Sequence, residues 1–164
     1  LLDLEELWVP YLEDINGGFF AVEVPALEEI KGPSLRHVGW VVLDELISLQ
    51  SVSFPSVETV DSNFIVTGGL ALEEVFVPQL STIGGDLHLE NNPVLAEQPF
   101  EVLDFVGNMV TVMHNDSLSQ CAVDALLEHL SQAMGEVPEG IWGEGNWVTC
   151  GCDESEDLPV ETCL

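Results

Sequence analysis

The sequence predicts a mainly β fold, a short parallel β-solenoid of about five coils. Prolines recur at Pro10, Pro33, Pro55 and Pro78 within a motif that repeats every 22–23 residues. Each unit also carries a stretch in which polar and apolar residues alternate, the pattern of a strand with one buried face. Proline at these fixed positions is incompatible with a helix interior. Repeats of this length bury their apolar residues by stacking on one another.

The solenoid is expected to span residues 1–118. Its clearest unit covers residues 72–95, where an alternating strand at 86–90 follows two glycines and precedes an Asn-Asn-Pro turn. Stacking at about 4.8 Å places equivalent residues in vertical columns. The three expected buried columns are Leu12, Leu35, Val57, Leu80 and Leu103; Ile15, Val38, Val60, Ile83 and Val106; and Phe19, Val41, Phe64, Leu87 and Val110. The second unit is one residue shorter than the others, and the third column aligns only if this deletion lies near Gly39.

A capping helix is expected at residues 119–135. Apolar residues recur there at three- and four-residue steps, and Gly135 supplies a stop. Ser117 and Gln120 have the spacing of a capping box at the start of the helix. An amphipathic helix at this point would seal the last coil, whose apolar side chains would otherwise meet water. No matching cap precedes the first coil, so we expect that coil to be an assembly or inter-domain surface of a mature or trimmed chain.

The remaining segment, residues 136–164, is a cysteine-rich tail. Zinc is disfavoured because no histidine stands at ligand spacing beside the Cys-x-Cys pair. Two disulfides are the preferred interpretation, and they imply an oxidising compartment. Bonding Cys150 to Cys152 would be strained, which leaves two arrangements. We favour Cys121–Cys150 with Cys152–Cys163 over Cys121–Cys152 with Cys150–Cys163.

The charge balance excludes several partners. The chain has thirty acidic residues and only two basic ones, Lys31 and Arg36, which gives a formal net charge of −28. Such a field repels nucleic acid phosphates and anionic lipid heads, so neither nucleic acid binding nor membrane insertion is expected, and no apolar run is long enough to span a bilayer. The acidity favours solubility and salt tolerance over calcium capture.

The repeat resembles the receptor L-domain family, whose members are short right-handed β-helices with units like leucine-rich repeats. Residues 72–95 carry the likeness most clearly, and residues 110–118 repeat its end. The resemblance covers about residues 1–134. The repeat units are also similar to those of fungal cell-wall proteins anchored by glycolipid and of secreted bacterial repeat proteins. The resemblance implies a right-handed solenoid on a secreted or cell-surface protein. It implies no particular ligand, because this family includes receptors and wall proteins.

An exposed apolar patch is the candidate binding site. The outward positions of the alternating strands form a central column of Phe20, Val42, Ile65, His88 and Thr111, with Trp40 in the column beside it. The amino-terminal half of this face is apolar, which marks either an interaction site or a surface covered by a loop or another domain. We therefore take as candidate protein- or glycan-binding residues Phe20, Trp40, Val42, Ile65 and His88.

A second set of columns is acidic. Glu5, Glu28 and Glu73 should stack with Gln50 between them, and such a ladder predicts at most a weak, diffuse response to divalent cations. No calcium-binding loop motif is present, and no dedicated metal site or cofactor is expected.

No catalytic motif is present. The histidines stand singly, and neither a nucleophile elbow nor a zinc-protease motif occurs. We expect a non-enzymatic, extracellular or cell-surface recognition module that binds a protein or glycan. The alternative is a structural wall or surface-layer component that self-associates through the first coil. A carbohydrate-active enzyme, with Asp86, His88 and Glu90 facing solvent together, is third.

Overall fold

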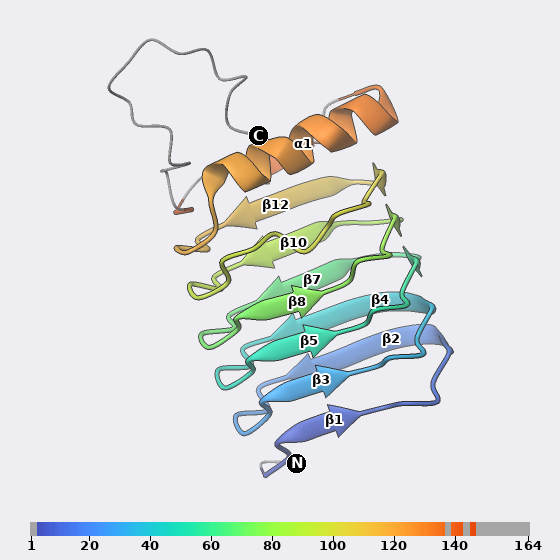
Figure 1. Cartoon of the computed structure of the whole chain (residues 1–164), viewed down its shortest axis with the longest axis vertical. Coiled ribbons are helices and arrows are strands. Elements are labelled where there is room, and N and C mark those ends of the chain that lie inside the picture. The colour runs from blue at the N-terminus through green and yellow to red at the C-terminus, as the bar shows by residue number, and fades with distance from the viewer. Residues whose placement is uncertain (1–2, 137–138, 143–144, 147–164) are drawn as a thin grey trace.

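The computed structural model describes residues 3–136, 139–142 and 145–146, and it confirms the predicted β-solenoid. Figure 1 shows about five coils stacked from the blue N-terminal end to the orange helix, which lies across the last coil. The strands pair in parallel with the strands of the next coil. Each coil therefore offers the next coil a row of backbone hydrogen-bonding groups.

Three ladders of strands run up the solenoid. The first ladder is a four-stranded sheet of β1 (Glu6–Trp8), β3 (Glu29–Lys31), β5 (Ser51–Ser53) and β8 (Glu74–Phe76). The second and third ladders share a nine-stranded sheet, because β2 (Asp14–Val22) and β4 (His37–Asp44) are long enough to belong to both. The second ladder continues with β6 (Thr59–Val60), β9 (Thr82–Ile83) and β11 (Phe105–Val106). The third ladder continues with β7 (Phe64–Thr67), β10 (Leu87–Glu90), β12 (Met109–Met113) and β13 (Glu139–Trp142).

The one-residue deletion in the second repeat unit lies at Gly39, where the alignment of the third buried column had placed it. Between β2 and β4 the register shifts after Ile15, so that Asn16 and Gly17 stand against Gly39 alone. A Cβ on Gly39 would lie 2.7 Å from the carbonyl oxygen of Gly17. Only glycine fits beneath this bulge.

The three columns form the core except in the first coil, where Leu12 is exposed and Ile15 is half-buried. Their members from the second coil upward are all buried. Leu12 was expected in the same column but is 37% exposed, which corrects that prediction. The physical reason is that Leu12 belongs to the first coil of the stack, which has a described neighbour on one side only. Burial contributes about 1.5–3 kcal/mol for each large aliphatic or aromatic side chain, so these columns account for much of the stability.

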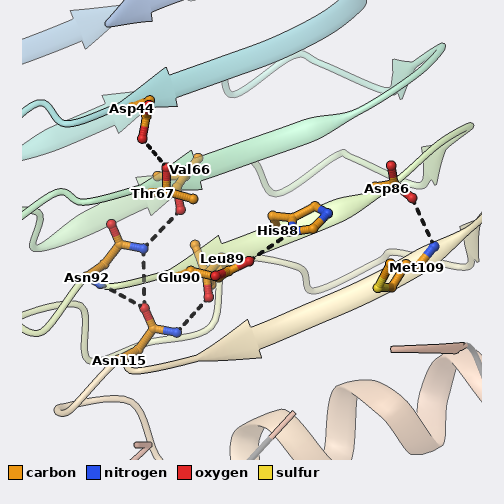
Figure 2. Close-up of polar contacts among 10 residues, drawn as sticks. All are labelled: Asp44, Val66, Thr67, Asp86, His88, Leu89, Glu90, Asn92, Met109 and Asn115. Carbon is orange, nitrogen blue, oxygen red and sulfur yellow. Dashed lines mark hydrogen bonds and ion pairs between the residues drawn. The ribbon is translucent and has the colours of Figure 1, made fainter. Parts of the chain in front are cut away.

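A ladder of buried asparagines follows the third ladder in the later coils (Figure 2). The Oδ1 atom of Asn92 accepts from the amide of Gly69 at 3.0 Å, and its Nδ2 atom donates to the carbonyl of Val66 at 3.1 Å. Asn115 repeats both contacts one coil later, with the amide of Asn92 and the carbonyl of Leu89. The two side chains also bond to each other. Each asparagine thus ties the turn of one coil to the coil below.

The same ladder ends beneath the helix. The Oδ1 atom of Asn146 accepts from the amide of Asn115 at 3.1 Å, and its Nδ2 atom donates to the carbonyl of Val112. This contact joins the segment that follows the helix to the last coil of the solenoid.

The turn just before each of these positions holds a left-handed residue. Positive φ angles recur at Glu23, Glu45, Gly68, Asn91 and His114, one per coil. Glycine and asparagine tolerate this conformation, whereas glutamate is strained in it. The first two coils therefore make the turn with less suitable residues than the third and fourth.

The helix α1 (Gln120–Met134) occupies the predicted place, and Gly135 is its left-handed C-cap. Its buried residues are Val123, Leu126, Leu127 and Leu130. The predicted capping box does not form, because the N-cap is Ser119 and its side chain makes no capping bond. The helix starts two residues later than the Ser117 capping box required. In the described part of the chain, no helix combines the length and hydrophobicity needed for a membrane span.

Candidate functional site

The candidate binding face is the outward surface of the third ladder in the first three coils, which we call the apolar face. Strand register places Phe20 beside Val42 and Val42 beside Ile65. Successive side chains of a strand alternate between faces, so these residues point away from the core while their neighbours in sequence fill it. The central column predicted from the sequence is therefore confirmed in its vertical order.

Trp40 turns this column into a patch. A Cβ built on Gly18 would lie 2.0 Å from the indole of Trp40, which means that the ring lies directly over this glycine. The ring also meets Phe20 edge to face, with centroids 5.9 Å apart and planes at 72°. Phe20 is 63% exposed and Trp40 is 37% exposed. Any side chain larger than hydrogen at position 18 would displace the indole, so Gly18 positions Trp40.

The upper end of the column is polar and makes its own contacts. Nδ1 of His88 lies 2.9 Å from Oε1 of Glu90 on the same strand, as Figure 2 shows. The pair is partly buried. His88 follows Ile65 in register, but it differs from the other four predicted residues in having a carboxylate partner.

Thr111 at the end of the column was expected to face outward. It is buried at 4% exposure, and β13 lies next to its strand. The expected solvent-facing row therefore ends at His88.

Acidic groups border the apolar face on both sides. On one side, Asp44 accepts a hydrogen bond from the hydroxyl of Thr67, and Glu90 contacts His88. On the other side, Asp61 contacts His37 at 2.9 Å. Figure 2 shows the next contact on this side, in which Oδ1 of Asp86 accepts from the amide of Met109 at 3.2 Å. Asp44 and Asp61 therefore border the face itself, whereas Asp86 and Glu90 lie one coil above it.

The two basic side chains lie on other parts of the solenoid. The Nζ atom of Lys31 bonds to Glu29 and lies 3.4 Å from Oε1 of Glu6, both on the first ladder. The hydrogen bond with Glu29, more than any other contact, raises the pKa of Lys31 above its usual value. Arg36 precedes β4 on the second ladder. Neither residue belongs to the strands that form the apolar face.

The acidic columns stack as predicted. The amide of Glu28 donates to the carbonyl of Glu5 at 2.7 Å, and the amide of Glu73 donates to the carbonyl of Gln50 at 2.9 Å. Within the residues that the structure describes, no three His, Cys, Asp or Glu side chains come together as a set that could hold a metal ion. The weak cation response at Glu5, Glu28 and Glu73 stays a prediction.

The predicted disulfides lie mostly outside the described residues. Cys121 is in the first turn of α1. Cys150, Cys152 and Cys163 are outside the described ranges. The pairing of Cys121 with Cys150 and of Cys152 with Cys163 therefore stays a prediction.

Sequence reasoning missed two features around this site. One is the bond network of the buried asparagines, although the 23-residue separation of Asn92 and Asn115 was visible. The other is the position of the indole over Gly18, which depends on a rotamer that periodicity does not specify.

Comparisons with known proteins yield no matching family model and no significant match among curated proteins or solved structures.

Proposed function

We propose that this protein is a non-enzymatic recognition module of the cell surface or extracellular space, and that its apolar face binds a basic partner protein. The supporting observation is the apolar cluster in which Phe20 and Trp40 are exposed beside the half-buried Val42 and Ile65, with carboxylates at both borders. Apolar side chains supply the attraction, and the acidic borders select a partner of opposite charge.

A protein partner fits better than a glycan. Sugar rings stack on broad, flat aromatic surfaces, and the rings of Phe20 and Trp40 are 72° apart. Only one of them can lie flat against a sugar. An irregular apolar surface with a charged border is instead typical of protein interfaces.

The resemblance to the receptor L-domain family supports the same proposal. A right-handed solenoid of that family would present its sheet to a partner outside the cell. The proposed disulfides of the tail would suit that oxidising compartment.

The test is selection from an unbiased displayed peptide library, followed by binding measurements on the selected peptides. We expect selected peptides rich in Lys, Arg and apolar residues. The double variant Val42→Lys and Ile65→Lys should lower their affinity by at least about tenfold, because it places two charges in a desolvated apolar contact. The matched control is Val94→Lys and Val102→Lys, which alters two exposed valines outside the face.

Unchanged affinity for the face variant would overturn the proposal, as would equal losses for the face variant and its control. Selected peptides without basic residues would contradict the charge of the proposed partner. A glycan array run in parallel would overturn the protein assignment if a glycan bound and the face variant abolished that binding.

Self-association remains a second candidate function, because the first coil also exposes large side chains. Trp8 and Tyr11 are exposed, and Leu12 adds to the same coil. Sedimentation over a range of concentrations tests it. A species whose mass does not change with concentration would contradict it, and loss of association in a Trp8→Ser and Tyr11→Ser variant would support it.

A further inference from the structure

The first ladder stops one coil before the other two. Its order is β1, β3, β5 and β8, so β8 is its last strand. The second ladder continues in the next coil as β11, and the third continues as β12. In the described residues, no strand pairs with the outer edge of β8. The solenoid therefore carries an unpaired strand edge in its side rather than at an end.

The missing bonds can be named by comparison with the lower coils. The carbonyls of Glu5, Glu28 and Gln50 each accept an amide from the next coil, at 2.7, 2.8 and 2.9 Å. The equivalent carbonyl is that of Glu73, and it receives no such bond from the described residues of the fifth coil. Unpaired backbone groups along a strand edge are a template for another strand.

In the fifth coil, the side chain of Gln98 takes up backbone groups that could otherwise join the first ladder. The amide of Phe100 donates to Oε1 of Gln98 at 2.8 Å, and Nε2 of Gln98 donates back to the carbonyl of Phe100 at 3.3 Å. Pro99 has no amide proton to donate to a ladder. This local turn holds the segment 96–101 away from a strand conformation.

A pocket of about 400 Å³ lies between β8 and this segment. Val75 and Phe76 line it from the strand, and Ala96 and Pro99 line it from the fifth coil. Phe76 is 41% exposed. The pocket offers apolar contacts next to the free edge.

The rim of the pocket is strongly acidic. Glu73, Glu74, Glu97 and Glu101 line it, and neither of the two basic residues of the chain does. An extended segment that carried lysine or arginine would pair its charges with these carboxylates.

We propose that β8 is a docking edge for an extended, basic segment of a partner protein, which adds a strand in the pocket between β8 and residues 96–101. Main-chain bonds to β8 would supply affinity, and alternate side chains would point to the acidic rim and to Phe76. This edge lies on the first ladder, whereas the apolar face lies on the third. The two proposals therefore stand or fall separately.

The experiment uses a peptide of about eight residues in which Lys and Val alternate, a usual strand length. Its affinity for the whole chain is measured by fluorescence anisotropy at low salt, and amide exchange at Val75 is followed with and without peptide. The variant Glu73→Lys and Glu97→Lys reverses two rim charges. The matched control, Glu5→Lys and Glu28→Lys, makes the same change of net charge in exposed residues of the first two coils.

We expect the rim variant to lower the affinity by about tenfold or more and the control by less than about threefold, because exposed distant charges act weakly. Amide exchange at Val75 should slow when the peptide binds. Equal losses in the two variants would overturn the proposal, since they would indicate diffuse attraction to an acidic protein. Absence of binding, or binding that leaves the exchange of Val75 unchanged, would overturn it as well.

Discussion

The lower and upper halves of this solenoid make the same turn with different chemistry. After the third ladder, the first two coils place Val24 and Leu46 at the position where later coils place Asn92 and Asn115. Leu46 is buried by apolar contacts, whereas the asparagines are buried by hydrogen bonds to the coil below. The same backbone path is thus compatible with an apolar column or with a hydrogen-bonded one, provided that the residues stacked on one another are of the same kind.

The same division runs across the candidate binding face. The lower half exposes Phe20 and Trp40, whereas the upper half carries His88 in contact with Glu90. A polar ladder tolerates little substitution because each member satisfies its neighbour. An apolar column accepts other apolar side chains more readily, because it contains no hydrogen bonds that each residue must satisfy. The apolar half is also the half that carries the proposed interaction surface.

The strongest test of this contrast is Asn115→Leu. It removes the acceptor of the Asn92 amide and the bonds of the Asn115 side chain to Leu89 and to the Asn92 side chain, all of them buried, so we expect the free energy of unfolding to fall by roughly 3–5 kcal/mol. Urea denaturation measures the loss, and amide exchange should show that the upper coils open first. A loss below about 1 kcal/mol would mean that the bonds are not what holds the upper turns.

The converse change, Leu46→Asn, tests whether the ladder of buried asparagines can be extended toward the N-terminal coils. The new side chain would face the backbone of the coil below, at the ladder position where Asn92 and Asn115 find their partners. We expect a cost of roughly 2 kcal/mol, against about 4 kcal/mol for Leu43→Asn in the same coil, where no such partners exist. Thermal or urea unfolding of both variants decides it. Equal costs would show that the lower half cannot adopt the polar column.

Glu45→Gly examines the strained turn of the lower half. Glu45 has φ of +52°, a conformation that the third coil gives to Gly68. Relief of this strain should stabilise the protein by about 0.5–1 kcal/mol, after the entropy of the added glycine is subtracted. The matched control is Glu58→Gly, at a position without a positive φ, which should destabilise. Loss of stability in both variants would contradict the account of the turn.

The smallest expected effect concerns Lys31 on the first ladder. Its contacts with Glu29 and Glu6 raise its pKa above the usual 10.5. A raised pKa stabilises the fold below the unfolded value, and that contribution is lost as pH rises through the folded value. The Lys31→Met variant should therefore lose less stability between about pH 9 and pH 12 than the parent chain, as alkaline denaturation curves would show, because this interval brackets the usual lysine pKa of 10.5. Parallel curves would mean that the pair contributes nothing in water.

Much of the fold could be predicted from residue types and spacing. The recurring prolines set the length of a coil, and the alternation in residues 86–90 identified the third ladder. The position of the deletion near Gly39 followed from aligning the repeats, and the register confirms it. These features succeed because a side-chain period of two and a fixed coil length leave few ways to stack apolar residues.

The candidate site was only partly predictable. Phe20, Val42 and Ile65 share a column because register decides it, but the placement of Trp40 over Gly18 depends on a side-chain rotamer. The exposure of Leu12 and the burial of Thr111 depend on what lies above and below them in the stack. A repeat pattern cannot show this, because it treats every coil as an interior one.

The sequence alone determined that this chain winds into coils, which residues of the interior coils face inward along the three buried columns, and where the helix ends at Gly135. Only the tertiary structure decided which ladder stops early. The side chain of Gln98 bonds to the backbone of Phe100, and the first ladder ends at β8, one coil below. The tertiary structure also decided that Asn92 and Asn115 bond across coils. The physical reason is that periodicity fixes neighbours along a column, whereas hydrogen bonds and steric fit between particular atoms fix what those neighbours do.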